Sequence, residues 1–164
     1  MSTENKIKLL MVDDEAKFLK SISSRLELQN FDVTSASNGE EAIAWAENGF
    51  FDVAVVDFQM PGINGAQVLK TLKARHKYLE IIILTGHATI DSAIECTRLG
   101  AFQYLEKPYA FEKLAETIKD AYEARLKRKF ANNTKRNLEI QKLSMGSSPL
   151  GILKALARLD NEEK

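Results

Sequence analysis

The sequence predicts an α/β fold in which a parallel sheet is covered by helices on both faces. Two observations predict it. Short runs rich in valine, isoleucine and leucine alternate with longer segments of helical periodicity, and these runs are apolar throughout. Continuous apolar runs are typical of strands that are buried on both faces. One strand followed by one helix, five times over, indicates right-handed crossovers and a doubly wound sheet.

The expected strands are short, and turn or capping residues follow them. They cover residues 7–12, 31–36, 53–56, 81–84 and 102–105. Five parallel strands with five helices suit the flavodoxin-like order 2-1-3-4-5. In that order the first and third strands lie at the switch point of the sheet, and ligands bind beyond the carboxyl ends of the strands there.

Helix start and stop signals separate these strands. Capping residues precede the expected helices, and asparagine or glycine follows them. The start signals are Asp14, Ser37 with Glu40, and Asn64, while the fourth helix is expected from about Thr89 and the fifth from Phe111. The stop signals are Asn30, Asn48 with Gly49, and Gly100. The fifth helix is expected to be long, because apolar residues keep helical spacing from Leu114 to Leu126.

Residues suited to phosphate or metal chemistry follow four of the strands. Asp13 and Asp14 follow the first strand, Asp57 the third, Thr85 the fourth and Lys107 the fifth. Because the carboxyl ends of parallel strands share one edge of the sheet, these side chains are expected to converge. Three carboxylates packed together repel, and a divalent cation such as Mg²⁺ or Mn²⁺ would neutralise them.

A carboxylate can attack phosphorus and form an acyl phosphate. Asp57 is central by position and is therefore the expected phosphoacceptor. Asp14, with help from Asp13, would hold the metal, while Lys107 and Thr85 would meet the phosphoryl oxygens. Each residue taken singly has a structural explanation, such as helix capping, but their joint placement at four strand ends favours a site.

The motifs resemble the receiver domain of two-component response regulators, the CheY-like family, over about residues 5–125. The resemblance rests on the aspartate pair and on four further features, which are VVDFQMPGING, ILTGHA, Tyr104 and Lys107-Pro108. It implies that Asp57 is phosphorylated. It also implies that Asp14 binds Mg²⁺ directly, that Asp13 does so through water, and that the backbone carbonyl of Gln59 is a further ligand.

The resemblance also implies a switch mechanism. Thr85 would move inward to donate to the phosphoryl group, and Tyr104 would rotate into the space that Thr85 vacates. This would change the surface made by the fourth helix, the fifth strand and the fifth helix. The Lys107–Pro108 peptide bond would be cis. Gln59 and His87 would flank the phosphoryl group and tune its lifetime, although an exposed loop histidine is the simpler interpretation of His87.

Composition gives no sign of a nucleic-acid or membrane surface. The 23 basic and 23 acidic residues cancel, and no signal or membrane-spanning run is apparent. Cys96 is the only cysteine and is expected to be a packing residue. We therefore expect a cytoplasmic protein with a receiver domain at residues 1–125. Residues 126–164 would form a helical extension, a linker and a short amphipathic helix.

The C-terminal extension carries a basic stretch and a short apolar helix. Residues 123–136 hold six cations and one acid, a pattern more typical of a solvated helix face than of a nucleic-acid site, and a frayed continuation of the fifth helix is expected. Residues 145–148 read as a linker, with Ser148 as N-cap and Pro149 at the first helical position. The apolar positions that follow are Leu150, Leu153, Leu156, Ala157 and Leu159. This helix would dock on its own receiver, on a second copy or on a partner.

We expect a single-domain response regulator that receives its phosphoryl group from a sensor histidine kinase or phosphotransfer protein. It resembles receivers of NtrC-type regulators but lacks their helix-turn-helix module. It would signal through protein contacts, and a homodimer through the fourth helix, fifth strand and fifth helix or through the C-terminal helix is a further expectation. A DNA-binding regulator that uses the basic segment is the alternative. An aspartyl-phosphate phosphatase fits less well, because Gln59 stands where its second aspartate is needed, so the chain is not expected to be an enzyme.

Overall fold

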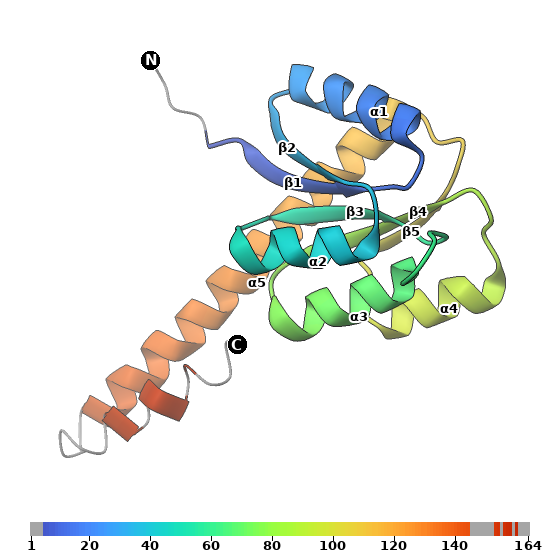
Figure 1. Ribbon diagram of the computed structural model, residues 1–164. Helices are drawn as coiled ribbons and strands as arrows, with labels where there is room; N and C mark the ends of the chain where they lie inside the picture. The colour runs from blue at the N-terminus through green and yellow to red at the C-terminus, as the bar shows by residue number, and fades with distance from the viewer. Residues whose placement is uncertain (1–4, 145–152, 155, 159, 161–164) are drawn as a thin grey trace.

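The computed structural model describes residues 5–144, 153–154, 156–158 and 160. Strands and helices alternate along this part of the chain (Figure 1). The strands are β1 (Ile7–Val12), β2 (Phe31–Ala36), β3 (Val53–Asp57), β4 (Glu80–Thr85) and β5 (Gln103–Glu106). The helices are α1 (Ala16–Leu28), α2 (Gly39–Asn48), α3 (Gly65–Arg75), α4 (Ile90–Arg98) and α5 (Phe111–Ser144).

The five strands form one parallel sheet in the order β2-β1-β3-β4-β5, which confirms the predicted fold. The strand order reverses between β1 and β3, so the crevice of the fold lies beyond the carboxyl ends of these two strands. Val12 of β1 is paired with Val56 of β3. Asp13 and Asp57, which follow this pair in sequence, therefore lie side by side at the carboxyl edge of the sheet.

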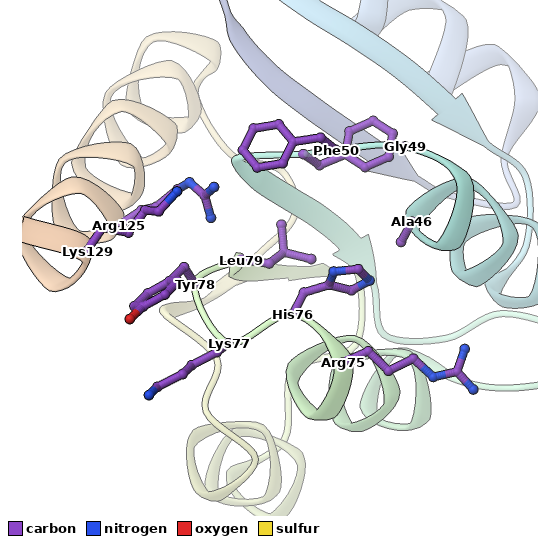
Figure 2. Close-up of a pocket in the computed structure, with 11 residues that line it drawn as sticks. Ala46, Gly49, Phe50, Arg75, His76, Lys77, Tyr78, Leu79, Arg125 and Lys129 are labelled. Atoms are coloured by element: carbon purple, nitrogen blue, oxygen red, sulfur yellow. The ribbon is translucent and has the colours of Figure 1, made fainter. Parts of the chain in front are cut away.

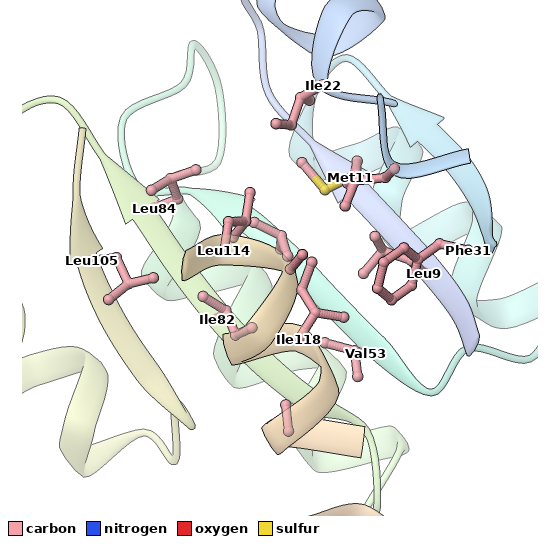
Figure 3. Close-up of a cluster of buried hydrophobic side chains, with 14 of the residues drawn as sticks. Leu9, Met11, Ile22, Phe31, Val53, Ile82, Leu84, Leu105, Leu114 and Ile118 are labelled. Carbon is pink, nitrogen blue, oxygen red and sulfur yellow. The ribbon is translucent and has the colours of Figure 1, made fainter. Parts of the chain in front are cut away.

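Apolar side chains cover both faces of the sheet, as the continuous runs predict. Leu9 and Met11 point to the face covered by α1 and α5, where they pack against Ile22 and Leu114 (Figure 3). Leu10 and Val12 point to the other face, which α2, α3 and α4 cover. Cys96 of α4 is fully buried in this second cluster, as expected of a packing residue.

Two helix starts differ from the prediction by one residue. α1 has Glu15 as its N-cap and not Asp14, while the carboxylate of Asp13 accepts a hydrogen bond from the backbone N–H of Glu15 at 2.9 Å. α2 is capped by Asn38, which accepts from the N–H of Glu41 at 2.8 Å, whereas Ser37 donates to the Glu41 carboxylate. An asparagine side chain reaches the first turn as well as a serine does, so spacing alone did not separate the two.

The remaining helix ends follow the predicted signals. Asn64 and Thr89 cap α3 and α4, each within a capping box. Asn30 and Gly100 adopt left-handed conformations, with φ of 70° and 94°, where α1 and α4 end. β5 lies one residue later than predicted, at Gln103–Glu106.

Helix α5 continues unbroken to Ser144 and is not frayed as predicted. Two ion pairs anchor it at the amino edge of the sheet. The Nε of Arg125 donates to Oδ1 of Asp52 at 3.1 Å, and Arg128 pairs with Glu80. Arg125 is only 4% exposed, so the expectation of a solvated basic face is wrong at this position.

The described residues of the C-terminal segment are helical, and one of them contacts α5. The carboxylate of Asp160 lies 2.6 Å from the guanidinium of Arg136. The expected linker at residues 145–148, the cap at Ser148 and Pro149, and the positions Leu150 and Leu159 lie outside the described residues. The domain boundary at residue 125 stays a prediction. In the described part of the chain, no helix combines the length and apolar character that crossing a membrane requires.

Candidate functional site

Three aspartates converge at the carboxyl edge of the sheet. Asp13 and Asp14 follow β1, and Asp57 is the last residue of β3. One carboxylate oxygen from each of the three lies within 4.8 Å of the others. Asp13 and Asp57 are 2% and 8% exposed, whereas Asp14 faces solvent. The strand-end pattern thus brings together the predicted carboxylates.

The electrostatics of this cluster favour a bound cation. Burial raises the pKa of Asp57 to about 6, and the neighbouring carboxylates of Asp13 and Asp14 add to the increase, while Lys107 and the N–H of Gln59 oppose it. A divalent cation would offset both the repulsion and the loss of hydration. Oxygen ligands of this kind are those that Mg²⁺ prefers. The three aspartates therefore fit a magnesium site.

Lys107 reaches the cluster from the end of β5. Its Nζ donates to Oδ2 of Asp13 at 2.6 Å and lies 4.2 Å from the centroid of the Phe18 ring. Its backbone N–H donates to the carbonyl of Thr85 at 2.7 Å. The peptide bond to Pro108 is cis, as the resemblance implied. Lys107 thus places a positive charge beside Asp13 and close enough to Asp57 to act on its pKa.

Thr85 and Tyr104 lie on neighbouring strands behind the cluster. Thr85 is fully buried, and its Oγ1 accepts a hydrogen bond from the backbone N–H of His87 at 3.2 Å. Tyr104 is half-buried against the face that α4 covers, and its hydroxyl lies 2.6 Å from Oγ of Ser92. Ser92 also closes the capping box of α4 with Thr89, so it links Tyr104 to the start of that helix.

Ser92 and Gly65 belong to the site region but were not predicted. A Cβ added at Gly65 would lie 2.6 Å from the carbonyl oxygen of Asp57 and 2.7 Å from the Cα of Phe58. Such contacts are too close for any other residue, so the start of α3 requires glycine here. The capping spacing from Thr89 to Ser92 was visible in the sequence, but nothing in it indicated the bond to Tyr104.

Gln59 and His87 lie on exposed loops beside the cluster. The backbone N–H of Gln59 contacts the Asp57 carboxylate, and the backbone N–H of His87 is bonded to Thr85. Both side chains are exposed. The metal-binding role of the Gln59 carbonyl and the tuning role of both residues stay predictions.

Comparison with known proteins matches residues 9–119 to the response regulator receiver domain family. The transcriptional regulatory protein ZraR of Salmonella typhimurium is 32% identical over 116 residues, which cover 71% of this chain and 26% of ZraR. The chain therefore spans about a quarter of the length of this regulator, and likewise of the C4-dicarboxylate regulator DctD of Rhizobium meliloti.

Solved receiver domains share the fold along most of their length. A CheY-like receiver domain protein from Methanospirillum hungatei JF-1 superposes with a TM-score of 0.74 at 28% identity, covering 76% of this chain and 99% of that one. The beryllofluoride-activated NtrC4 receiver domain dimer gives a TM-score of 0.68 at 33% identity, covering 72% and 98%. From the family match together with the aspartate cluster, Lys107 and the sheet order, we conclude that this chain belongs to the response regulator receiver domain family of two-component signalling.

Proposed function

We propose that Asp57 accepts a phosphoryl group from a sensor histidine kinase or phosphotransfer protein. The observation that carries this proposal is the convergence of three aspartate carboxylates within 4.8 Å, next to the ammonium group of Lys107. A carboxylate oxygen of Asp57 attacks phosphorus, and the bond from phosphorus to the donor breaks as the donor leaves. The product is an acyl phosphate on Asp57.

The other residues of the cluster have supporting roles in this proposal. Asp13, Asp14, Asp57 and the carbonyl of Gln59 would hold Mg²⁺ or Mn²⁺, which supplies positive charge to the phosphoryl oxygens when bound. Lys107, whose Nζ lies 2.6 Å from Oδ2 of Asp13, would stabilise the same charge. Asp57 must be ionised to attack, so a buried carboxylate with a raised pKa gains from these cations.

The signal would pass through Thr85 and Tyr104 to the surface made by α4, β5 and α5. Phosphorylation adds strong acceptor oxygens, and the hydroxyl of Thr85 is placed at the strand end to donate to one of them. Tyr104 already contacts Ser92 at the start of α4, so a shift of its ring changes that helix. Phosphorylation shifts the equilibrium between the two positions of Tyr104 only if the new hydrogen bonds to the phosphoryl group are more stable in one of them.

A partner or a second copy would read this surface. Ile90 and Ile94 of α4 are 80% and 45% exposed, which provides apolar area for such a contact. The activated NtrC4 receiver is a dimer, which supports a homodimer as one output. In this proposal the chain assists its own phosphorylation and dephosphorylation and does not act as an enzyme on a separate substrate. Its single-domain organisation and cytoplasmic location stay predictions.

The contacts of the basic segment weaken the DNA-binding alternative. Three of its cations have acidic partners within the described residues. The pairs are Arg125 with Asp52, Arg128 with Glu80, and Arg136 with Asp160. A nucleic acid can contact only cations that reach the outer surface of the helix, whereas Arg125 is 4% exposed. This segment instead uses half of its cations to hold α5 and the C-terminal segment.

The proposal is tested by intact mass measurement after incubation with Mg²⁺ and acetyl phosphate. We expect the mass of one added phosphoryl group on the native chain and none on Asp57→Asn. Asp120→Asn, which changes an exposed carboxylate on α5, is the matched control and should be labelled as the native chain is. Labelling of Asp57→Asn, or labelling that persists when Mg²⁺ is chelated, would contradict the proposal.

The tuning role of Gln59 and His87 has its own test. We expect His87→Ala to change the half-life of the aspartyl phosphate, because His87 is exposed and its backbone N–H is bonded to Thr85 beside the cluster. The half-life is followed by intact mass after the phosphodonor has been removed. An unchanged half-life in both His87→Ala and Gln59→Ala would rule this role out.

A further inference from the structure

A second site lies at the amino edge of the sheet, opposite the aspartate cluster. It is a cavity of about 200 Å³ between α5, the loop before β3 and the loop between α3 and β4 (Figure 2). Phe50 borders it on one side, and His76 and Leu79 border it on the other. Arg125 and Lys129 reach it from α5, at the point where this helix leaves the domain.

The charged groups around this cavity are of one sign. Among the described residues that line it, Arg75, Lys77, Arg125 and Lys129 are cationic and none is acidic. Arg75 pairs with Glu47 and points away from the centre of the cavity, as Lys77 does (Figure 2). Arg125 and Lys129 are therefore the cations that a ligand in the cavity would meet.

Several hydrogen-bond donors at the cavity are left without a protein partner. Asp52 engages Arg125 through Nε, and within the described part of the chain the two Nη nitrogens of Arg125, which are not sealed from solvent, donate to no protein acceptor. The imidazole of His76 likewise has no hydrogen-bond partner among the described residues. Burial and the neighbouring Arg75 lower the pKa of His76, which favours its neutral form, and a neutral imidazole donates from one nitrogen.

Apolar and aromatic groups form the rest of the wall. Phe50 and Tyr78 each have the ammonium group of Lys129 5.9 Å from the ring centroid, and Arg125 lies 4.8 Å from that of Phe50. Phe51 and Leu79 complete the apolar lining. Apolar walls with a few convergent polar groups are typical of small-molecule sites. Drug-sized ligands usually occupy about 300 Å³ or more, so a ligand here must be small.

We propose that this cavity binds a small organic anion, whose carboxylate or phosphate group accepts hydrogen bonds from Arg125 and whose apolar body lies against Phe50 and Leu79. Lys129 adds charge at the rim, and His76 donates a further bond. The site is separate from Asp57 and does not depend on phosphorylation. Because two of its cations belong to α5, the bound anion would tie this helix to the loops at the amino edge of the sheet.

The proposal is tested by nuclear magnetic resonance titration of the full chain with benzoate, with phenyl phosphate and with neutral benzyl alcohol at constant ionic strength. The ring signals of His76 are the readout, because the chain has two histidines and His76→Gln identifies them. We expect saturable shifts of the His76 ring with at least one anion and none with benzyl alcohol. Whichever anion binds more tightly assigns the head group as carboxylate or phosphate.

Two lysine variants on the same helix decide whether the cavity is the site. Lys129→Gln removes a lining cation and should weaken binding by about threefold to tenfold. Lys127→Gln removes an exposed lysine that does not line the cavity and should change binding by less than about twofold. Equal effects of the two variants, shifts that do not saturate, or equal shifts with benzyl alcohol would overturn the proposal.

Discussion

Asp57 combines a buried position with two neighbouring carboxylates, and this affects folding as well as chemistry. Its pKa in the folded chain is about 6, above the ordinary value of 3.8. When folding raises the pKa of a carboxyl group, its protonated form stabilises the folded state. This stabilisation is complete at a pH below the pKa of the unfolded chain, and it is lost as the pH rises through the pKa of the folded chain. The ionised site therefore lowers the free energy of unfolding at neutral pH.

Asp57→Asn should raise the stability of the metal-free protein. We expect a gain in the free energy of unfolding of about 1–2 kcal/mol near pH 8, after allowance for solvent screening. The gain should shrink as the pH falls through the window between 6 and 3.8. Urea denaturation at several pH values measures it, and added Mg²⁺ should narrow the difference by stabilising the native carboxylates. A gain that is independent of pH would show that charge is not its cause.

Gly65 shows how an element start can hold a site residue in place. The first turn of α3 lies against the backbone of Asp57 and Phe58, and the N–H of Gly65 donates to the carbonyl of Phe58 at 2.8 Å. This close approach fixes the end of β3 against the next helix. The position of the Asp57 carboxylate therefore depends on a residue that has no side chain.

Gly65→Ala should damage both stability and labelling. Its Cβ would meet backbone atoms that cannot move aside, so we expect a loss of about 1–3 kcal/mol in the free energy of unfolding. Labelling of Asp57 by acetyl phosphate should also become slower. Gly86→Ala is the matched control, because a Cβ there has no atom within 4 Å and the residue also lies next to the site. Similar losses in the two variants would contradict this explanation.

Helix α5 depends on a buried ion pair for its docking at the amino edge of the sheet. Asp52 accepts from Arg125 through one oxygen and from the backbone N–H of Lys8 through the other, at 3.1 and 2.9 Å. The pair thus joins α5 to the start of β1 and to the residue before β3. Removing only the cation leaves a buried carboxylate without compensation.

Arg125→Met should lower the free energy of unfolding by about 2–4 kcal/mol. Adding Asp52→Asn to this variant should recover part of the loss, since the uncompensated charge is then gone. Lys127→Met, an exposed change on the same helix, should have an effect below about 0.5 kcal/mol. Urea denaturation of the native chain, of Arg125→Met, of Asp52→Asn and of the double variant gives the double-mutant cycle, and additive losses would show that the two residues are not coupled.

The elements of this fold were largely predictable, whereas their long-range ion pairs were not. Apolar runs set the strands, and strand ends placed Asp13, Asp14 and Asp57 together, because parallel strands share an edge. The partners Arg125 and Asp52 are 73 positions apart, and a run of basic residues gives no sign of which members are buried. The expected N-cap of α2 was one residue too early, because Ser37 and Asn38 are neighbours and both residue types can cap a helix.

The part of the chain that the structure describes is not compact, because α5 extends beyond the sheet (Figure 1). Its 34 residues correspond to about 51 Å of helix. A compact chain of 164 residues would have a radius of gyration of about 15 Å. We expect small-angle X-ray scattering of the monomer to give a value several ångströms larger.

Truncation after Arg128 provides the control for this measurement. The shortened chain keeps both anchoring ion pairs of α5, and its radius of gyration should fall to about 14 Å, as for a compact domain of its length. Extrapolation to zero concentration separates shape from association. A full-length value near that of a compact chain would mean that the extension folds against the domain in solution.

The anchoring of α5 also determines how far a small movement at the sheet is felt. Beyond Arg128 the helix runs on to Ser144 as an arm of about 24 Å. If α5 tilted by about 10° about Arg128, its end at Ser144 would move by about 4 Å. The extension therefore converts a small rotation of its anchored part into a displacement of several ångströms at Ser144, about 24 Å away.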